Sequence, residues 1–122
     1  MFDRARTAAA AALAALALAA CSGSNARGDV TPGPGGPDAV PLVAVELAFQ
    51  PERLELPAGE PVRIEVRNRG AAAHDFTVEP LGLSTGAIEP GGVATATLEV
   101  PPGETPFVCS LHPGMEGVIV GT

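Results

Sequence analysis

Apolar and polar residues alternate with a period of two through most of the chain after residue 39. The most regular stretch is 62–67, where three branched apolar residues are separated by charged ones. The same period recurs at 43–49, 53–56, 76–78 and 94–100. A period of two is typical of strands that bury one face. Together with short segments at 105–109 and 117–121, the pattern predicts an all-β fold, a Greek-key β-sandwich of about seven or eight strands.

The stretch 43–49 is expected to form one continuous strand. Its odd-numbered residues, from Val43 to Phe49, are apolar and are expected to face the core. The chain has no Trp or Tyr, so the domain can bury only three aromatic residues, Phe49, Phe76 and Phe107. Because aromatic side chains bury large areas, we expect these three to contribute disproportionately to the core.

The first 20 residues have a different pattern. A short opening with Arg4 and Arg6 precedes an apolar run from Thr7 to Ala20, which has 14 residues. Such a run is too short to span a bilayer but typical of a secretory signal. It ends at Leu18-Ala19-Ala20-Cys21, which resembles the bacterial lipobox. That resemblance implies cleavage before Cys21, lipidation of Cys21 and an extracytoplasmic protein anchored by lipid to the bacterial cell membrane.

The segment after Cys21 is predicted to be a flexible linker. Residues 22–38 contain eight Gly or Pro among seventeen residues and almost no large apolar side chain. This composition favours a tether without structure of its own. The predicted organisation is therefore a lipoprotein signal peptide at 1–20, the lipidated Cys21 and linker at 21–38, and one domain at 39–122.

The charge balance narrows the choice of partners. The formal net charge is -7, and every basic residue is an Arg. An acidic chain without a basic patch argues against nucleic acid as a partner. We expect a monomeric domain whose contact with the membrane is limited to the lipid anchor.

The residues with the richest chemistry lie in one short segment, Cys109-Ser110-Leu111-His112-Pro113-Gly114-Met115. A thiolate, an imidazole and a thioether match three ligands of the trigonal site, with two His, one Cys and a distant Met, that copper uses for electron transfer. One more imidazole is needed, and His74 is the only other histidine. The alternative is an ordinary structural role, because Cys and Met are also common core residues.

Two other uses of these residues are disfavoured. Zinc accepts Cys and His ligands, but a thioether is a poor ligand for zinc and suits copper. A disulfide between Cys21 and Cys109 is also conceivable. Cys21 lies at the lipobox cleavage point, however, and its distance in sequence from Cys109 gives no geometric reason for pairing.

Three segments resemble the small blue copper proteins of the cupredoxin family. They are Phe49-Gln50-Pro51, His74-Asp75-Phe76 and the segment from Phe107 to Gly117. The two-residue gap between His112 and Met115 is most similar to amicyanin and its plastocyanin-like relatives. The resemblance covers 40–121 and implies one type 1 copper ion that cycles between Cu(I) and Cu(II). It implies His74, Cys109 and His112 as equatorial ligands and Met115 as the axial ligand.

Two residues depart from the pattern of this family. Asp75 stands where many relatives have Asn, and its carboxylate either caps amides of the 110–114 loop or faces solvent; the sequence leaves both open. Leu111 stands where several relatives have Pro. We hypothesise that the Leu111 N–H donates to the Cys109 sulfur, withdraws charge from it and raises the reduction potential.

The sequence predicts a carrier and not an enzyme. With only two His in the chain, no imidazoles remain for a second, catalytic copper centre. A single Cys in the domain also excludes a binuclear two-cysteine centre, and no catalytic constellation of another kind stands out. We therefore expect single-electron transfer between extracytoplasmic redox partners. The alternative is an extracytoplasmic copper-binding or delivery protein without fast redox cycling, although the chain has no Met-rich or His-rich tract.

The electron is expected to leave through His112. The residues expected to form an apolar docking patch around it are Leu81, Leu83, Leu111 and Pro113. Packing in the core or in a loop is an equally good interpretation of the Leu residues.

Overall fold

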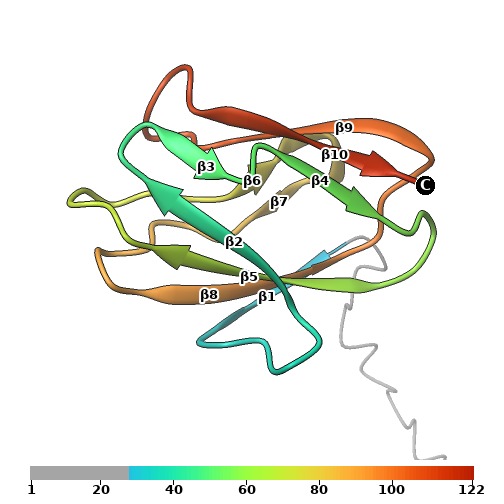
Figure 1. Cartoon of the computed structure of the whole chain (residues 1–122), viewed down its shortest axis with the longest axis horizontal. Coiled ribbons are helices and arrows are strands. Elements are labelled where there is room, and N and C mark those ends of the chain that lie inside the picture. Colours follow the sequence, from blue (N-terminus) through green and yellow to red (C-terminus); the bar gives the residue numbers. More distant parts are fainter. Residues whose placement is uncertain (1–27) are drawn as a thin grey trace, which may run out of the picture.

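The alternating segments form the strands of two stacked sheets. The computed structural model describes residues 28–122 (Figure 1). The first sheet contains, in spatial order, β1 (Gly28–Pro32), β8 (Val93–Leu98), β5 (Val62–Asn68), β2 (Val40–Val45) and β3 (Ala48–Gln50). The second contains β4 (Arg53–Leu56), β10 (Glu116–Gly121), β9 (Gly103–Val108), β6 (Thr77–Val78) and β7 (Leu83–Ser84).

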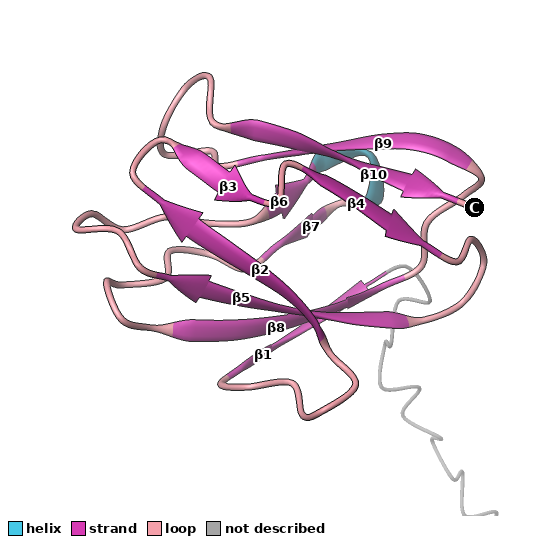
Figure 2. Ribbon diagram, viewed as in Figure 1, coloured by secondary structure: helices cyan, strands magenta, loops and turns pink. Residues whose placement is uncertain are grey.

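Most neighbouring strands are antiparallel. Only β2 with β5 and β10 with β4 run parallel in the part of the chain that the structure describes. The only helical element there is a single 3-10 turn, η1 (Glu79–Leu81), which is the cyan segment of Figure 2. Residues 28–122 contain no helix long and apolar enough to cross a membrane. The predicted all-β Greek-key sandwich is confirmed.

The strand count is higher than predicted. Residues 28–122 contain ten strands. Two of them, β6 and β7, have two residues each, and so short a strand leaves no detectable period in a sequence. The segment around Ile88 contributes an isolated bridge to His74 instead of a strand.

The core forms where the inward faces of the two sheets meet. Ile64 and Val66 of β5 are fully buried, as their alternation with charged residues predicts. The three phenylalanines are also buried and pack together, with ring centroids 5.0 Å apart for Phe49 and Phe107 and 5.2 Å apart for Phe76 and Phe107. The expectation that all three rings lie in the core is confirmed, and their disproportionate contribution to its stability stays a prediction.

The predicted strand 43–49 is wrong in its continuity, and its predicted buried face is wrong for residues 43–47 but correct for Phe49. The chain turns at residues 46–47, which separates β2 from β3. In β2 the fully buried side chains are Leu42 and Ala44, which are the even-numbered positions. Leu47 is 66% exposed, with a φ of 61° in the turn. Both faces of this stretch carry apolar residues, so alternation alone did not identify which face is buried.

Part of the predicted linker is a strand. Residues 28–32 form β1, which pairs antiparallel with β8 along its whole length. Val30 packs against the core, and Gly28 lies so close to Leu83 that a Cβ there would be 2.3 Å from the Leu83 Cδ1 atom. For residues 28–32 the prediction of a flexible linker is therefore wrong, because backbone pairing needs little apolar sequence. The predicted signal peptide at 1–20 and Cys21 lie outside the described residues.

The loops that carry the chemistry lie at one end of the sandwich. The segment after β5, the loop between β9 and β10, and the turn between β2 and β3 all lie at the left end in Figure 1. The segment after β5 leaves the first sheet, and the loop between β9 and β10 belongs to the second sheet. The sandwich therefore brings together residues that are far apart in the sequence.

Candidate metal centre

The segment 109–115 is a tight loop between two paired strands. β9 and β10 are antiparallel neighbours, and Val108 pairs with Glu116 at the base of the loop. Cys109 N donates to Met115 O at 2.9 Å and closes the loop. Within it, Met115 N donates to His112 O at 3.1 Å. The backbone thus fixes all three residues that the sequence predicts as ligands from this loop.

His74 reaches the same place from the segment that connects β5 of the first sheet to β6 of the second. It is fully buried and forms an isolated antiparallel bridge with Ile88. Its N–H donates to Ile88 O at 3.1 Å, and Ile88 N donates to His74 O at 2.7 Å. These bonds hold the His74 backbone although no regular strand includes it.

Asn68 organises the segment that leads to His74. This side chain is 1% exposed. Its Nδ2 donates to Ala72 O at 2.8 Å and Ile88 O at 2.7 Å, while its Oδ1 accepts from Gly70 N at 2.8 Å. Asn68 is not among the residues predicted from the sequence. A signal was present, because Asn68 continues the inward face of Ile64 and Val66, where a polar residue is unusual.

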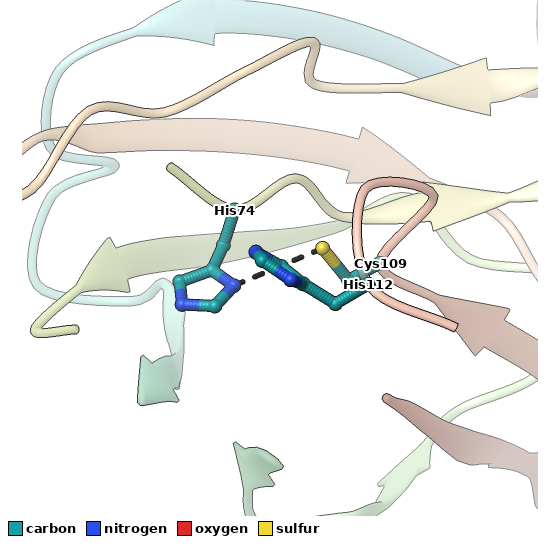
Figure 3. Close-up of side chains that lie close together, drawn as sticks. All are labelled: His74, Cys109 and His112. Carbon is teal, nitrogen blue, oxygen red and sulfur yellow. Dashed lines mark hydrogen bonds between the residues drawn. The ribbon is translucent and has the colours of Figure 1, made fainter. Parts of the chain in front are cut away.

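The donor atoms of three predicted ligands converge. One ligand atom each from His74, Cys109 and His112 lies within 4.8 Å of the others. The Cys109 Sγ atom is 3.8 Å from His74 Nδ1, and the two imidazole centroids are 4.7 Å apart. Figure 3 shows both rings and the sulfur gathered at one point, with a dashed line from His74 to Cys109. Two buried residues and one half-buried residue, His112, form the cluster.

The hydrogen bond of His112 leaves one ring nitrogen available for a metal. The Nε2 atom of His112 is 3.0 Å from Ala73 O. A carbonyl oxygen can only accept, so Nε2 carries the hydrogen. In the neutral ring, Nδ1 then keeps its lone pair, and imidazole ligands bind a metal in this way while the other nitrogen donates to a fixed acceptor.

The hydrogen bond to the Cys109 sulfur comes from a different residue than the one expected from the sequence. Asp75 N donates to Cys109 Sγ at 3.4 Å. Among the residues that the structure describes, Leu111 N makes no hydrogen bond to this sulfur, so the proposed role of Leu111 is wrong. The tight turn from Cys109 to His112, in which His112 N approaches Cys109 O at 3.4 Å, gives the Leu111 amide no such contact.

The Asp75 carboxylate ties the two ligand loops together. Its Oδ1 accepts from Ser110 N at 2.8 Å and from Thr77 Oγ1 at 3.1 Å, and its Oδ2 accepts a short bond from Ser110 Oγ. Asp75 is only 4% exposed. The structure therefore favours the capping role over the solvent-facing one.

The remaining predicted residues fall into different environments. Met115 is buried at the end of the ligand loop, 1% exposed, and its role as axial ligand remains a prediction. Of the proposed docking patch, Leu111 is 47% exposed and Pro113 is also exposed, whereas Leu83 is a core residue. Leu83 is therefore wrong as a patch residue, because it faces inward from β7.

The donor set fits a soft metal. One thiol and two imidazoles are held together by backbone hydrogen bonds, and this set suits Cu or Zn better than Mg or Ca, which prefer oxygen. A buried thioether on the same loop favours copper over zinc. A β-sandwich with this cluster at one end defines the cupredoxin-like class.

Comparison with known proteins gives the family. Residues 9–120 match the model of the cupredoxin-like domain, and the chain belongs to this family. No curated protein gives a significant match to the sequence.

Solved structures show the same fold. Reduced auracyanin from Roseiflexus castenholzii is 21% identical, with a TM-score of 0.59 over 72% of this chain and 99% of that chain. The Cu(I) form of an amicyanin variant is 18% identical, with a TM-score of 0.65 over 79% of this chain and 99% of that chain. A Cu-containing nitrite reductase from Thermus scotoductus is 25% identical, with a TM-score of 0.59 over 75% of this chain but only 25% of the reductase.

Proposed function

We propose that this chain is a mononuclear type 1 copper protein that carries single electrons between extracytoplasmic redox partners. The observation that carries the proposal is the convergence of His74, Cys109 and His112 within 4.8 Å in a cupredoxin-like fold. Copper would supply the one-electron Cu(I)/Cu(II) couple. Cys109 and the two imidazoles would hold it, with Met115 as the weak fourth ligand.

The chain's own residues favour electron transfer because they hold the ligands in place before a metal binds. The 109–115 loop is closed by its own backbone, and Asp75 connects it to the segment that carries His74. Ligands fixed in this way need little rearrangement when the oxidation state changes. His112 is half-buried beside the exposed Leu111, which supports it as the route by which an electron leaves.

A carrier role accounts for the sequence better than catalysis does. The nitrite reductase neighbour is matched over a quarter of its length, so its activity gives no argument for this chain. The chain has two histidines in total, and the proposed site uses both. A second copper centre with imidazole ligands would need histidines from outside these 122 residues.

The proposed location rests on the amino-terminal sequence. A signal peptide at 1–20 and a lipidated Cys21 would hold the domain on the extracytoplasmic side of a bacterial membrane. A free thiol at Cys109 is compatible with this oxidising environment when a metal occupies it. The donor and acceptor would be redox proteins that approach the end of the sandwich where His112 lies.

Copper delivery is the competing function, and redox cycling distinguishes the two. We expect the copper-loaded protein to show a reversible one-electron wave in protein-film voltammetry and to retain its copper over many cycles. Metal content after cycling, in the presence of a Cu(I) chelator, is the second measurement. Loss of copper to the chelator at each reduction would instead support delivery.

A further inference from the structure

The three ligands of the proposed site are not equally well supported by their neighbours. His112 has Ala73 O as the acceptor for its second ring nitrogen, and Cys109 has a donor in Asp75 N. The Nε2 atom of His74, in contrast, is buried and has no hydrogen-bond partner among the described residues. A buried N–H without an acceptor is costly, and histidines that bind metals nearly always donate their second nitrogen to a carboxylate, a carbonyl or water.

A carboxylate lies close to this nitrogen. A Cβ atom at Gly70 would be 2.8 Å from His74 Nε2 and 2.8 Å from Glu46 Oε1. His74 Nε2 and Glu46 Oε1 are therefore no more than twice 2.8 Å apart, and both lie on the side of Gly70 to which a side chain would point. Because Gly70 has no side chain, nothing from that residue stands between the carboxylate and the imidazole.

Glu46 is already directed toward the His74 segment. Its Oε1 accepts a short hydrogen bond from Ala71 N, across 25 positions of sequence. Glu46 belongs to the turn between β2 and β3, where Leu47 has a φ of 61°, a conformation that non-glycine residues rarely adopt. A carboxylate has about four acceptor positions, so one bond to Ala71 N leaves capacity for another donor.

We propose that Glu46 is a positioning residue that accepts the Nε2–H of His74 when His74 Nδ1 binds the metal. The bond fixes the tautomer that leaves Nδ1 free, sets the ring orientation and makes the imidazole a stronger ligand. This inference rests on the proposed metal site. It adds a residue from a third loop, one that contributes no ligand of its own.

Three variants separate this role from a simple structural one. Glu46→Ala removes the acceptor, and Glu46→Gln keeps an amide oxygen in its place. Gly70→Ala leaves Glu46 intact but places a methyl group 2.8 Å from both Glu46 Oε1 and His74 Nε2, so that the two groups must move. The matched control is Glu60→Ala, which removes an exposed carboxylate from the turn before β5, at the opposite end of that strand from the His74 segment.

The first readout is Cu(I) affinity, measured by competition with a chromophoric chelator. Removing a hydrogen-bond partner of a metal ligand typically weakens affinity about 10–100-fold. We expect a loss of that order in Glu46→Ala and Gly70→Ala, near wild-type affinity in Glu46→Gln, and no change in Glu60→Ala. Circular dichroism of each apoprotein verifies that the fold is intact.

The second readout observes His74 itself. In the diamagnetic Cu(I) protein, nitrogen-15 NMR should show a protonated, slowly exchanging Nε2 on His74. We expect faster exchange and a shifted nitrogen resonance in Glu46→Ala and Gly70→Ala only. Unchanged His74 signals and affinity in both variants would overturn the inference, because a cap on Ala71 alone would leave them unchanged. Absence of copper binding by the wild type would overturn the proposed function instead.

Discussion

Asp75 makes the most hydrogen bonds between the two ligand loops. Its N–H donates to the Cys109 sulfur, and its carboxylate accepts from Ser110 N, Ser110 Oγ and Thr77 Oγ1. All three groups facing the carboxylate can donate, which suits a group that only accepts. Asp75 therefore has a structural reason to be an acid here.

Removing this carboxylate should destabilise the apoprotein. In Asp75→Ala the Ser110 N–H and two hydroxyl groups lose an acceptor that is only 4% exposed. Removing three part-buried hydrogen bonds costs about 1–3 kcal/mol in total. We expect the free energy of unfolding to fall by about that amount in urea denaturation without metal. Asp38→Ala is the control, because the one polar side-chain contact of Asp38 among residues 28–122 is an exposed ion pair with Arg63 at 3.9 Å. Such pairs contribute at most about 1 kcal/mol. Equal stability of the two variants would contradict the role of Asp75.

At the scale of elements, the strand β1 extends the domain beyond its predicted start at residue 39. β1 pairs with β8, and the segment after it is also held, since Gly33 N donates to Val93 O at 3.0 Å and Thr95 Oγ1 donates to Gly33 O at 2.7 Å. Without β1, β8 would become an exposed edge strand.

A chain that begins at residue 39 should therefore be less stable than one that begins at residue 28. Val30 is half-buried, and full burial of a Val is worth about 1.5–3 kcal/mol, so we expect a loss of about 1–2 kcal/mol in chemical denaturation. Val30→Ser should reproduce part of the loss, whereas Thr31→Ser on the exposed face should not. If the two chains unfolded at the same denaturant concentration, β1 would contribute nothing to stability.

The elements also show how far the sequence can be interpreted. The strands with charged residues on one face, such as β5, could be predicted with their buried face. The stretch 43–49 could not, because apolar residues occupy both of its faces and the turn at Leu47 needs a φ that no residue pattern indicates. β1 could not be predicted because a Gly- and Pro-rich segment can still pair through its backbone.

The candidate site was predictable for a different reason. Cys, His and Met are rare in this chain, so their close spacing at 109–115 indicated a metal site. His74, the only other histidine, was then the one candidate for the missing imidazole ligand. The residues that support the ligands were not predictable. Asn68 and Glu46 act through contacts that depend on how the loops of three strands meet, which only the folded chain reveals.

For the whole molecule, the proposed metal site joins the connection between the two sheets to a loop of the second sheet. His74 lies in the connection from β5 of the first sheet to β6 of the second, while Cys109 and His112 lie between β9 and β10 of the second. A bound metal would therefore link this connection to the β9–β10 loop at one end of the sandwich, the end that a redox partner would approach in the proposed function. The central claim is that this end holds a copper–thiolate site.

The most direct test is the visible absorption spectrum of residues 28–122 after one equivalent of Cu(II). This segment contains a single cysteine, Cys109, so any thiolate-to-copper band must come from it. We predict an intense blue band that disappears on reduction, is absent in Cys109→Ser and persists in Leu111→Ala, which changes an exposed residue of the same loop. A colourless or weakly coloured copper complex of the wild type would contradict the account.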